Sequence, residues 1–185
     1  MSGTVYKFGG GCIGSGAKAI NNMARIAAFL LDKQASLKNG IVVVVSAPAG
    51  ITDLLEGAAE LNPALSDTPE LDELLSQGEI ISTQLLLAAI GGMGGKAMTL
   101  TGRGVIVTDD QYGNATIIRV NTRRIEEELA RGNIVIVAGF QGATLKGVVT
   151  TLGRVGSDTT AVALAKSLGA ECVICKETEG IHTAD

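Results

Sequence analysis

Aromatic residues are scarce in this sequence: it has no tryptophan, and aromatic residues make up only 3% of its 185 positions. Hydrophobic residues nevertheless account for 46% of the chain. A core built mainly from Val, Ile, Leu and Ala is typical of parallel α/β sheets, whose strands are buried on both faces. The length suits about one domain with a sizeable core.

Positive charge is also in short supply, because 15 Lys and Arg stand against 19 Asp and Glu and the formal net charge is −4. No cluster of Lys and Arg is interleaved with aromatic residues, so we expect no nucleic-acid partner. The longest apolar runs, 41–45 and 85–90, are far shorter than the ~18 residues that a membrane span needs. The chain does not open with a signal-peptide pattern. These absences predict a cytoplasmic protein with no membrane partner.

Potential metal ligands are few. The three cysteines cannot all pair with one another, which fits a reducing compartment. Cys172 and Cys175 form a Cys-x-x-Cys pair, but they lie in an apolar run that reads as a strand, where this spacing puts the two sulfurs on opposite faces. There is no second ligand pair, and His182 is the only histidine. We therefore predict no metal site formed by the protein alone.

Apolar patterning predicts strands that alternate with helices. The expected strands are 4–8, 41–46, 96–100, 134–138 and 172–175; the expected helices are 17–33, 52–61, 68–90, 121–131 and 160–168. Residues 102–116 read as an irregular excursion. This alternation predicts an α/β fold, a three-layer α/β/α sandwich with a mostly parallel sheet and helices on both faces, without an internal domain boundary.

A glycine-rich tract joins the strand 134–138 to the helix that follows it. It contains Gly139-Phe140-Gln141-Gly142 and then the run Thr150 to Ala161, with Arg154, Ser157 and Asp158 in it. Glycines permit close backbone approach, a helix start favours negative charge, and a guanidinium suits a carboxylate or phosphate. Ser157 or Asp158 alone would more simply be a helix cap. The combination predicts an anion site.

The first loop carries glycines after Lys7. The run Gly9-Gly10-Gly11-Cys12-Ile13-Gly14 fits G-x-G-x-x-G, yet the second strand ends at Ser46, where a dinucleotide site wants an acidic residue. A phosphate-binding Walker loop fails too, because Ala17 takes the place of its lysine. What remains is a lysine at a strand end, placed to meet a transferring phosphoryl group.

Two further segments carry polar side chains that suit a ligand. Ser46 and Thr52 follow the second strand, where open α/β sheets bind ligands, although Thr52 or Asp53 alone suits a helix cap equally well. Glu79 is next to Gly78, a glycine within a helix that close approach of a ligand or another backbone would explain. The alternative for Glu79 is an exposed helix carboxylate.

In order and spacing, these segments resemble the aspartate kinases of the amino acid kinase family over essentially the whole chain. The similar segments are Lys7 to Gly10, Val45 to Thr52, Gly78 to Ser82, Gly139 to Gly142, Thr150 to Asp158, and Glu179 to Asp185. The resemblance implies transfer of the γ-phosphoryl group of ATP, with Mg²⁺, to the side-chain carboxylate of L-aspartate, a step toward lysine, threonine and methionine. It also implies a homo-oligomer at full length.

The resemblance assigns a role to each matching residue. Lys7 and Asp158 would be catalytic, with Lys7 stabilising the phosphoryl group. Arg154 would bind the substrate's α-carboxylate and Glu79 its ammonium group, with Ser46, Thr52 and Ser157 around them. The nucleotide would be bound by Lys7, Phe8, Gly9, Gly10, Lys176, Glu177 and His182.

The chain also departs from the family pattern. Gly11-Cys12 replaces Thr-Ser, Val155 replaces glycine, Lys176-Glu177 replaces Thr-Asp, and His182 replaces tyrosine. We expect residues 1–185 to be an amino acid kinase catalytic domain that stops within its nucleotide lobe, has no regulatory ACT domain and is poorly active alone. The alternatives are a non-catalytic amino-acid-binding or assembly module, a kinase for a glutamate derivative, or, on the glycine spacing only, a dinucleotide-dependent oxidoreductase.

Overall fold

The centre of the molecule is a five-stranded sheet in which every neighbouring pair is parallel. The computed structural model describes residues 3–36 and 40–177. The strands are β1 (Thr4–Phe8), β2 (Ile41–Val45), β3 (Ala97–Leu100), β6 (Ile134–Ala138) and β9 (Glu171–Cys175), in the order β3-β6-β2-β1-β9. The predicted parallel α/β sheet is thus confirmed, as are its five strands.

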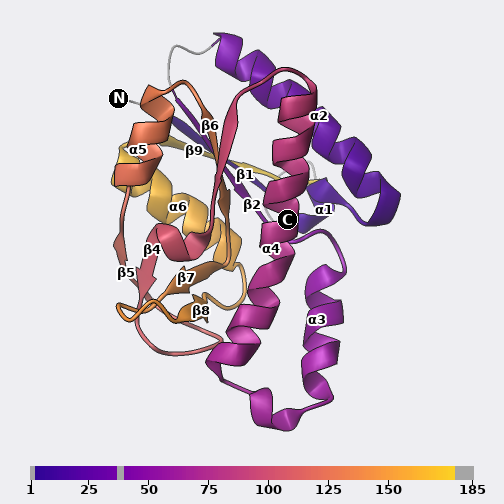
Figure 1. Cartoon of the computed structure of the whole chain (residues 1–185), viewed down its shortest axis with the longest axis vertical. Helices are drawn as coiled ribbons and strands as arrows, with labels where there is room; N and C mark the ends of the chain where they lie inside the picture. Colours follow the sequence, from indigo (N-terminus) through magenta and orange to yellow (C-terminus); the bar gives the residue numbers. More distant parts are fainter. Residues whose placement is uncertain (1–2, 37–39, 178–185) are drawn as a thin grey trace, which may run out of the picture.

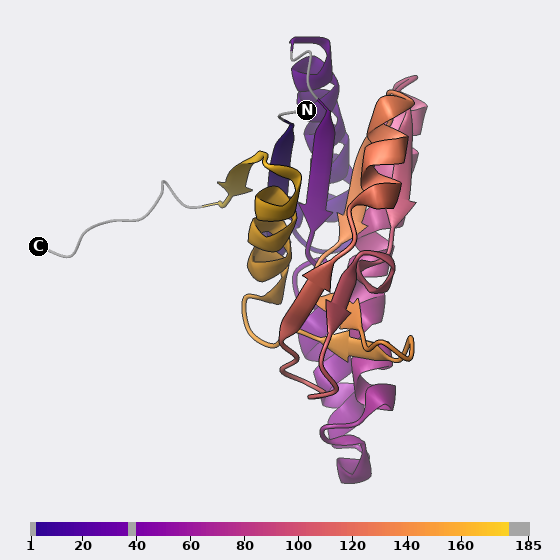
Figure 2. The same ribbon diagram turned by 90° about the vertical axis from the view of Figure 1, so that its left-hand side faces the viewer.

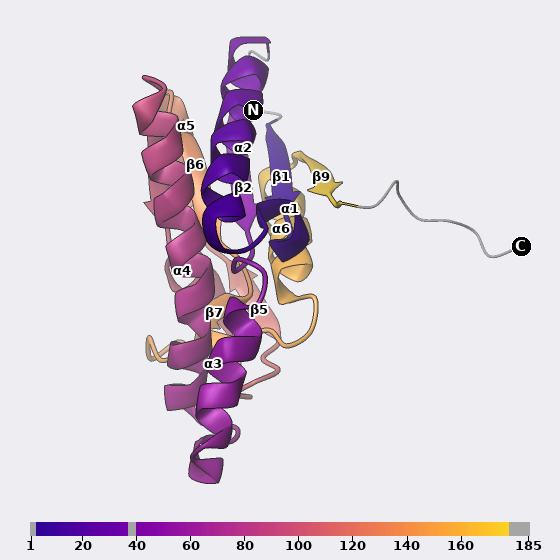
Figure 3. The ribbon, with the colours of Figure 1, turned by 90° about the vertical axis from the view of Figure 1, so that its right-hand side faces the viewer.

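Helices cover both faces of this sheet (Figure 1). The short α1 (Gly10–Ile13), α2 (Gly16–Ser36) and α4 (Pro69–Gly92) pack on the face that carries Val43 and Val45. On the other face, α5 (Arg123–Ala130) and α6 (Gly156–Leu168) pack against Val42 and Val44. Figure 2 views the sheet from the side of α5 and α6, and Figure 3 from the side of α2 and α4. The predicted α/β/α sandwich is confirmed.

The alternation of strand side chains explains both cores and the positions of two cysteines. Cys172 packs against the α6 side of the sheet and Cys175 against the α2 side, which confirms their predicted opposite orientation. Three of the five aromatic rings, those of Tyr6, Phe8 and Phe29, meet on the α2 side, where Phe29 contacts Tyr6 edge to face with ring centroids 5.4 Å apart. Among the described residues no group of three potential metal ligands is found.

A second sheet lies beyond the carboxyl ends of the main strands. It contains β5 (Ile117–Val120), β4 (Ile106–Thr108), β7 (Gln141–Ala143) and β8 (Val149–Thr151), in that order. The expectation of an irregular excursion over 102–116 is therefore wrong for its first half, which holds a 3₁₀ turn at Gly102–Gly104 and β4, whereas 109–116 forms no helix or strand. Strands of three or four residues carry too little alternation to be recognised from sequence.

Helix α4 connects the two sheets. Its predicted start is confirmed, because Thr68 Oγ1 accepts a hydrogen bond from Leu71 N at 3.3 Å and Pro69 is the first helical residue. By length and composition alone α4 is apolar enough to cross a membrane, with 44% of its most apolar window buried. Its buried residues include Asp72, Ser76 and Glu79, and it packs along the sheet. We therefore describe α4 as a core helix.

Two other helix starts differ from prediction. Helix α3 (Ile51–Glu60) follows Gly50, which has left-handed backbone angles, and neither Thr52 nor Asp53 caps it. A 3₁₀ turn at Pro63–Leu65 then leads to α4. Helix α6 begins at Gly156 after Val155, also left-handed at φ 57°, so Ser157 and Asp158 lie inside the first turn and do not cap it. Both side chains are thereby left available to the site described below.

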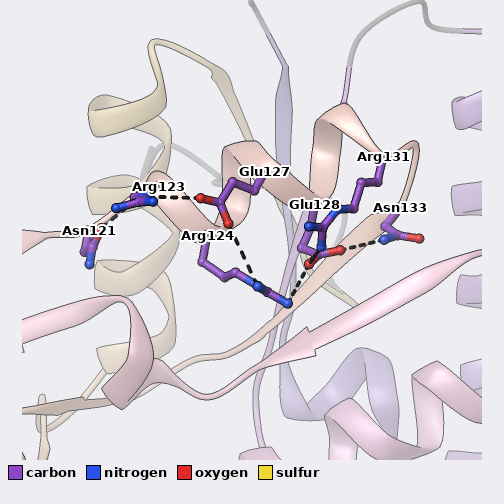
Figure 4. A network of polar contacts seen from close by, with 7 residues as sticks. All are labelled: Asn121, Arg123, Arg124, Glu127, Glu128, Arg131 and Asn133. Carbon is purple, nitrogen blue, oxygen red and sulfur yellow. Dashed lines mark hydrogen bonds and ion pairs between the residues drawn. The ribbon is translucent and has the colours of Figure 1, made fainter.

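A buried carboxylate anchors the turn between α5 and β6 (Figure 4). Glu128 is 3% exposed, and its Oε1 lies 2.7 Å from Arg124 Nη2 and 2.6 Å from Arg131 Nη1. Its Oε2 accepts a hydrogen bond from Asn133 Nδ2 at 2.7 Å. These contacts satisfy both oxygens and fix the direction in which the chain enters β6, the strand that ends at the glycine-rich tract.

Candidate active site

A pocket of about 620 Å³ opens at the carboxyl ends of β1 and β2. It is lined by segments that are far apart in sequence: the ends of those strands, α3, α4, the loop at Gly113, and the tract from Gly153 to Asp158. Of the residues predicted for the site, those on its wall are Lys7, Gly10, Ser46, Thr52, Glu79, Arg154, Ser157 and Asp158. Ligand sites in open parallel sheets lie at this edge.

Glu79 is a buried acid with one unused oxygen. It is 4% exposed, Oε1 accepts a hydrogen bond from Ala47 N at 3.0 Å, and Oε2 has no hydrogen-bond partner among the described residues. Burial raises the pKa of this carboxyl from 4.5 to about 7, while the Ala47 N–H acts in the opposite direction. The alternative of an exposed helix carboxylate is therefore wrong. A cation in the pocket would supply the partner that Oε2 lacks.

Gly78 explains how Glu79 reaches the loop after β2. A Cβ atom at position 78 would lie 2.6 Å from the Cβ of Ala47, so only glycine allows this loop to approach α4 so closely. That approach places the N–H of Ala47 within reach of Glu79. The helical glycine is accounted for by close approach of another backbone, one of the two reasons expected from the sequence.

Arg154 lines the same pocket as Glu79, although 75 positions separate the two residues in the chain. Arg154 forms no ion pair within residues 3–36 and 40–177. An anionic and a cationic side chain therefore share one cavity and are not paired with each other. This arrangement suits a zwitterion, whose ammonium and carboxylate groups need opposite partners.

Lys7 lies at the end of β1 and points to the first turn of α6. Its Nζ is 2.6 Å from Asp158 Oδ1, and Lys176 Nζ is 3.9 Å from Asp158 Oδ2. The side chain of Lys7 is only 9% exposed. The predicted place of Lys7 at a strand end is confirmed, and its side chain points toward the loop 153–158. Two lysines on one carboxylate leave a net positive charge beside a helix N-terminus, which favours a phosphate.

Glycines bring the backbone close to this charge. A Cβ at Gly9 would lie 3.2 Å from Lys7 Nζ, and one at Gly139 would lie 2.7 Å from the side chain of Ser157. The second contact means that Gly139 lets the start of α6 approach the end of β6. Ser157, in the first turn of α6, is thereby held on the pocket wall.

The remaining nucleotide residues do not all reach this pocket. Phe8 and Glu177 line a separate pocket of about 400 Å³ together with Gly11, Cys12 and Arg25. The Glu177 carboxylate lies directly over Gly11, in the space that a Cβ there would occupy. His182 lies outside the described residues.

Sequence reasoning missed Gly113 and Phe140, which also line the first pocket. Gly113 belongs to a loop that was read as irregular, and it reaches the site only through the fold of the second sheet. Phe140 has left-handed backbone angles, with φ 65°, which is uncommon for a bulky residue. This backbone angle marks Phe140 as unusual in the structure, but a backbone angle cannot be read from the sequence.

Comparison with known proteins decides the family. The sequence model of the amino acid kinase family matches residues 3–185, nearly the whole chain. The chain belongs to the amino acid kinase family.

The relatives of this amino acid kinase are described as aspartokinases. The aspartokinase of Geobacillus stearothermophilus is 44% identical over 98% of this chain and 44% of its own length. Among solved structures, aspartate kinase from Synechocystis matches 96% of this chain and 28% of its own with a TM-score of 0.81 at 37% identity. E. coli aspartokinase III in complex with aspartate and ADP has a TM-score of 0.75 at 30% identity, over 94% of this chain and 48% of its own. This chain therefore spans less than half the length of these relatives.

Proposed function

We propose that this amino acid kinase chain is the catalytic domain of an aspartate kinase. The reaction transfers the γ-phosphoryl group of ATP to the side-chain carboxylate of L-aspartate. The observation that carries the proposal is the shared pocket of Glu79 and Arg154, one a buried carboxylate with an unused oxygen and the other a guanidinium without an ion pair in the described chain. The relative crystallised with aspartate and ADP supports the same ligand pair.

Each of the two charged groups on the α-carbon of the amino acid has a side chain of opposite charge in the pocket. Glu79 Oε2 accepts from the ammonium group, and the fork of Arg154 binds the α-carboxylate with two parallel hydrogen bonds. The hydroxyl groups of Ser46, Thr52 and Ser157 lie on the same wall and complete the rim. With the α-carbon end held by these groups, the side-chain carboxylate is directed toward Lys7.

The chemistry requires positioning and charge more than base catalysis. A side-chain carboxylate has a pKa near ~3.9 and is already ionised at neutral pH, so it can attack the γ-phosphorus directly. A bond forms between a carboxylate oxygen and phosphorus while the bond to the bridging oxygen of ADP breaks. Lys7 neutralises charge on the transferred group, and Asp158 holds its ammonium in place at 2.6 Å.

The nucleotide is assigned to the lysine end of the pocket. The two lysines and the glycines beside them fit a polyphosphate, with Lys7, Gly9, Gly10 and Lys176 as its contacts. Mg²⁺ arrives with the phosphates and keeps several waters, so a cage of protein ligands is not needed. The proposal also includes Phe8, Glu177 and His182 as nucleotide contacts, as the family resemblance implies. A cytoplasmic location and a homo-oligomeric assembly are parts of the same proposal.

The proposal is tested with the protein expressed with everything its gene encodes. ADP release is followed with L-aspartate, L-glutamate and N-acetylglutamate, and the acyl phosphate is trapped with hydroxylamine. We expect turnover with aspartate only. Turnover with a glutamate derivative alone would favour a kinase for that substrate instead. Ligand binding without turnover would favour a non-catalytic amino-acid-binding module.

Glu79→Gln tests the assigned contact within that assay. Glutamine keeps the size of the side chain but not its charge, so KM for aspartate should rise at least about tenfold while KM for ATP changes little. Glu56→Gln, a second acid on the pocket wall, is the matched control. An equal rise in both KM values would indicate general destabilisation instead.

A further inference from the structure

Asp72 is a fully buried carboxylate outside the pocket. It lies on α4 with 0% of its surface exposed. Its oxygens accept four hydrogen bonds: Gly113 N donates to both at 3.0 Å, Thr151 N donates to Oδ2 at 2.8 Å, and Thr151 Oγ1 donates to Oδ1 at 2.7 Å. No lysine or arginine pairs with it within the described ranges. A buried charge is thus held by donors from two other elements alone.

These donors belong to the segments that form one wall of the pocket. Gly113 lines the pocket itself, and Thr151 is three residues before Arg154. The two segments also touch each other: Ala115 N donates to Thr151 O at 2.8 Å, and a Cβ at Gly153 would lie 2.5 Å from Asn114 Oδ1. The side chain of Asp72 therefore joins the loop and the strand at the point where they meet.

The opposite wall is carried by the same helix. Glu79 follows Asp72 by seven residues, two turns along α4, so both side chains lie on one helix face. Between them, Ser76 O accepts a hydrogen bond from Gln141 Nε2 at 2.9 Å, which also holds β7 to this face. One rigid helix thus carries Glu79 directly and holds the Arg154 segment through Asp72.

We propose that Asp72 is a positioning residue that fixes the separation between Glu79 and the Arg154 wall, and so the fit of this pair to the ammonium and α-carboxylate groups on the α-carbon of the bound amino acid. The proposal rests on the proposed function for the identity of the ligand but not for the anchoring itself. Misplacement of a binding group by about 1 Å can cost about a hundredfold in rate, so even a small displacement of Gly113 and Arg154 matters.

The variants separate anchoring from charge. In Asp72→Asn the remaining oxygen can accept from both backbone N–H groups while the new NH₂ group donates to Thr151 Oγ1, so the wall stays in place. Asp72→Ala removes all four bonds. Thr151→Val removes one bond at nearly constant volume, and Thr151→Ser keeps it. Glu70→Ala, at an exposed position two residues earlier on α4, is the matched control.

Two measurements are made on the full gene product: KM for aspartate and ATP, and amide hydrogen exchange. For Asp72→Ala we expect KM for aspartate to rise about tenfold or more and KM for ATP to change less than about threefold. Thr151→Val should show the same changes in KM, but smaller ones. It replaces Asp72→Ala in the test if Asp72→Ala does not fold. The amides of Gly113 and Thr151 should exchange faster in both. Asp72→Asn, Thr151→Ser and Glu70→Ala should resemble wild type.

Other outcomes overturn the proposal. Equal rises in the KM values for aspartate and ATP would mean a general structural role, and a severe defect in Asp72→Asn would mean a charge role. If wild type does not use aspartate at all, the proposed function fails, and anchoring is judged on amide exchange in Thr151→Val and Thr151→Ser. Unchanged protection of Gly113 and Thr151 in the valine variant then overturns it, and faster exchange only there supports it.

Discussion

Glu79 and Lys7 are both buried ionisable residues, but within the described chain only Lys7 forms an ion pair. Lys7 has a carboxylate partner at 2.6 Å, so its burial is compensated within the protein. Glu79 has one N–H donor and no cation at its second oxygen within the described chain, and burial raises its pKa to about 7. A group held in this way is suited to bind a cation brought by a ligand, and it carries a cost when the pocket is empty.

That cost depends on pH. Because the folded-state pKa of Glu79 is raised from 4.5 to about 7, its contribution to folding is most favourable below 4.5 and is lost as pH rises through about 7. The loss amounts to roughly 3 kcal/mol at most. Without ligand, Glu79→Gln should therefore be more stable than wild type at pH 8, and this advantage should shrink by pH 5. Denaturant unfolding at both pH values measures it, and an advantage independent of pH would contradict the cause.

Lys7→Ala should remove catalysis while sparing aspartate binding. Loss of one group that neutralises charge in the transition state costs about a hundredfold or more in kcat. KM for aspartate should change little, because Glu79 and Arg154 bind the substrate's other end. Lys166→Ala, an exposed lysine on α6, is the control. An unchanged kcat in steady-state kinetics would mean that a residue other than Lys7 contacts the phosphoryl group.

Among the elements, the central strands of the main sheet could be predicted from sequence because β2 and β6 are short apolar runs buried on both faces. The second sheet could not, since β7 contains only Gln141, Gly142 and Ala143. The starts of α3 and α6 were misjudged because Gly50 and Val155, in left-handed conformation, set them in place of a Ser, Thr or Asp cap.

The same limit applies to the site. Lys7, Glu79 and Arg154 stand in recognisable segments, so the sequence predicted that they meet. The contacts of Asp72 join residues 41 and 79 positions away, and nothing local to Asp72 distinguishes it from a solvent-exposed helix acid. Contacts of this kind depend on how α4 packs on the second sheet, which local patterning does not encode.

Helix α4 offers a test of its own at Gly78. Gly78→Ala would place a Cβ 2.6 Å from that of Ala47, and the strain should exceed the gain in helix propensity of about 1 kcal/mol. We expect a net loss of about 1 to 2 kcal/mol and weaker aspartate binding, because the Ala47 loop is pushed from Glu79. Gly57→Ala on α3, where no atom lies within 4 Å, should instead stabilise by about 0.5 to 1 kcal/mol. Stabilisation by both changes, measured by thermal unfolding, would show that the loop yields freely.

At the scale of the whole molecule, the two substrate ends of the pocket differ in how completely the described chain builds them. The groups assigned to aspartate come from the residue after β2, from α3 and α4, and from the segment 154–157 that leads into α6, all within the described residues. The nucleotide end lies beside β9, which is the last strand in the sheet order and pairs only with β1 in the part of the chain described. The relatives extend over more than twice the length matched here.

Residues 1–185 expressed alone should therefore bind aspartate, bind ATP weakly and turn over poorly. Phosphoryl transfer needs nucleotide, metal and acceptor in line, and the contacts proposed for the nucleotide in the described residues are few: Lys7, Lys176 and the glycines beside them. The free edge of β9, with Ile174 38% exposed, should also promote association. Calorimetry with each ligand, light scattering and the coupled assay are compared with a fusion of the same residues to the carboxyl-terminal half of a related aspartokinase. Equal ATP affinity and equal turnover in the two proteins would show that residues 1–185 already form the complete nucleotide site.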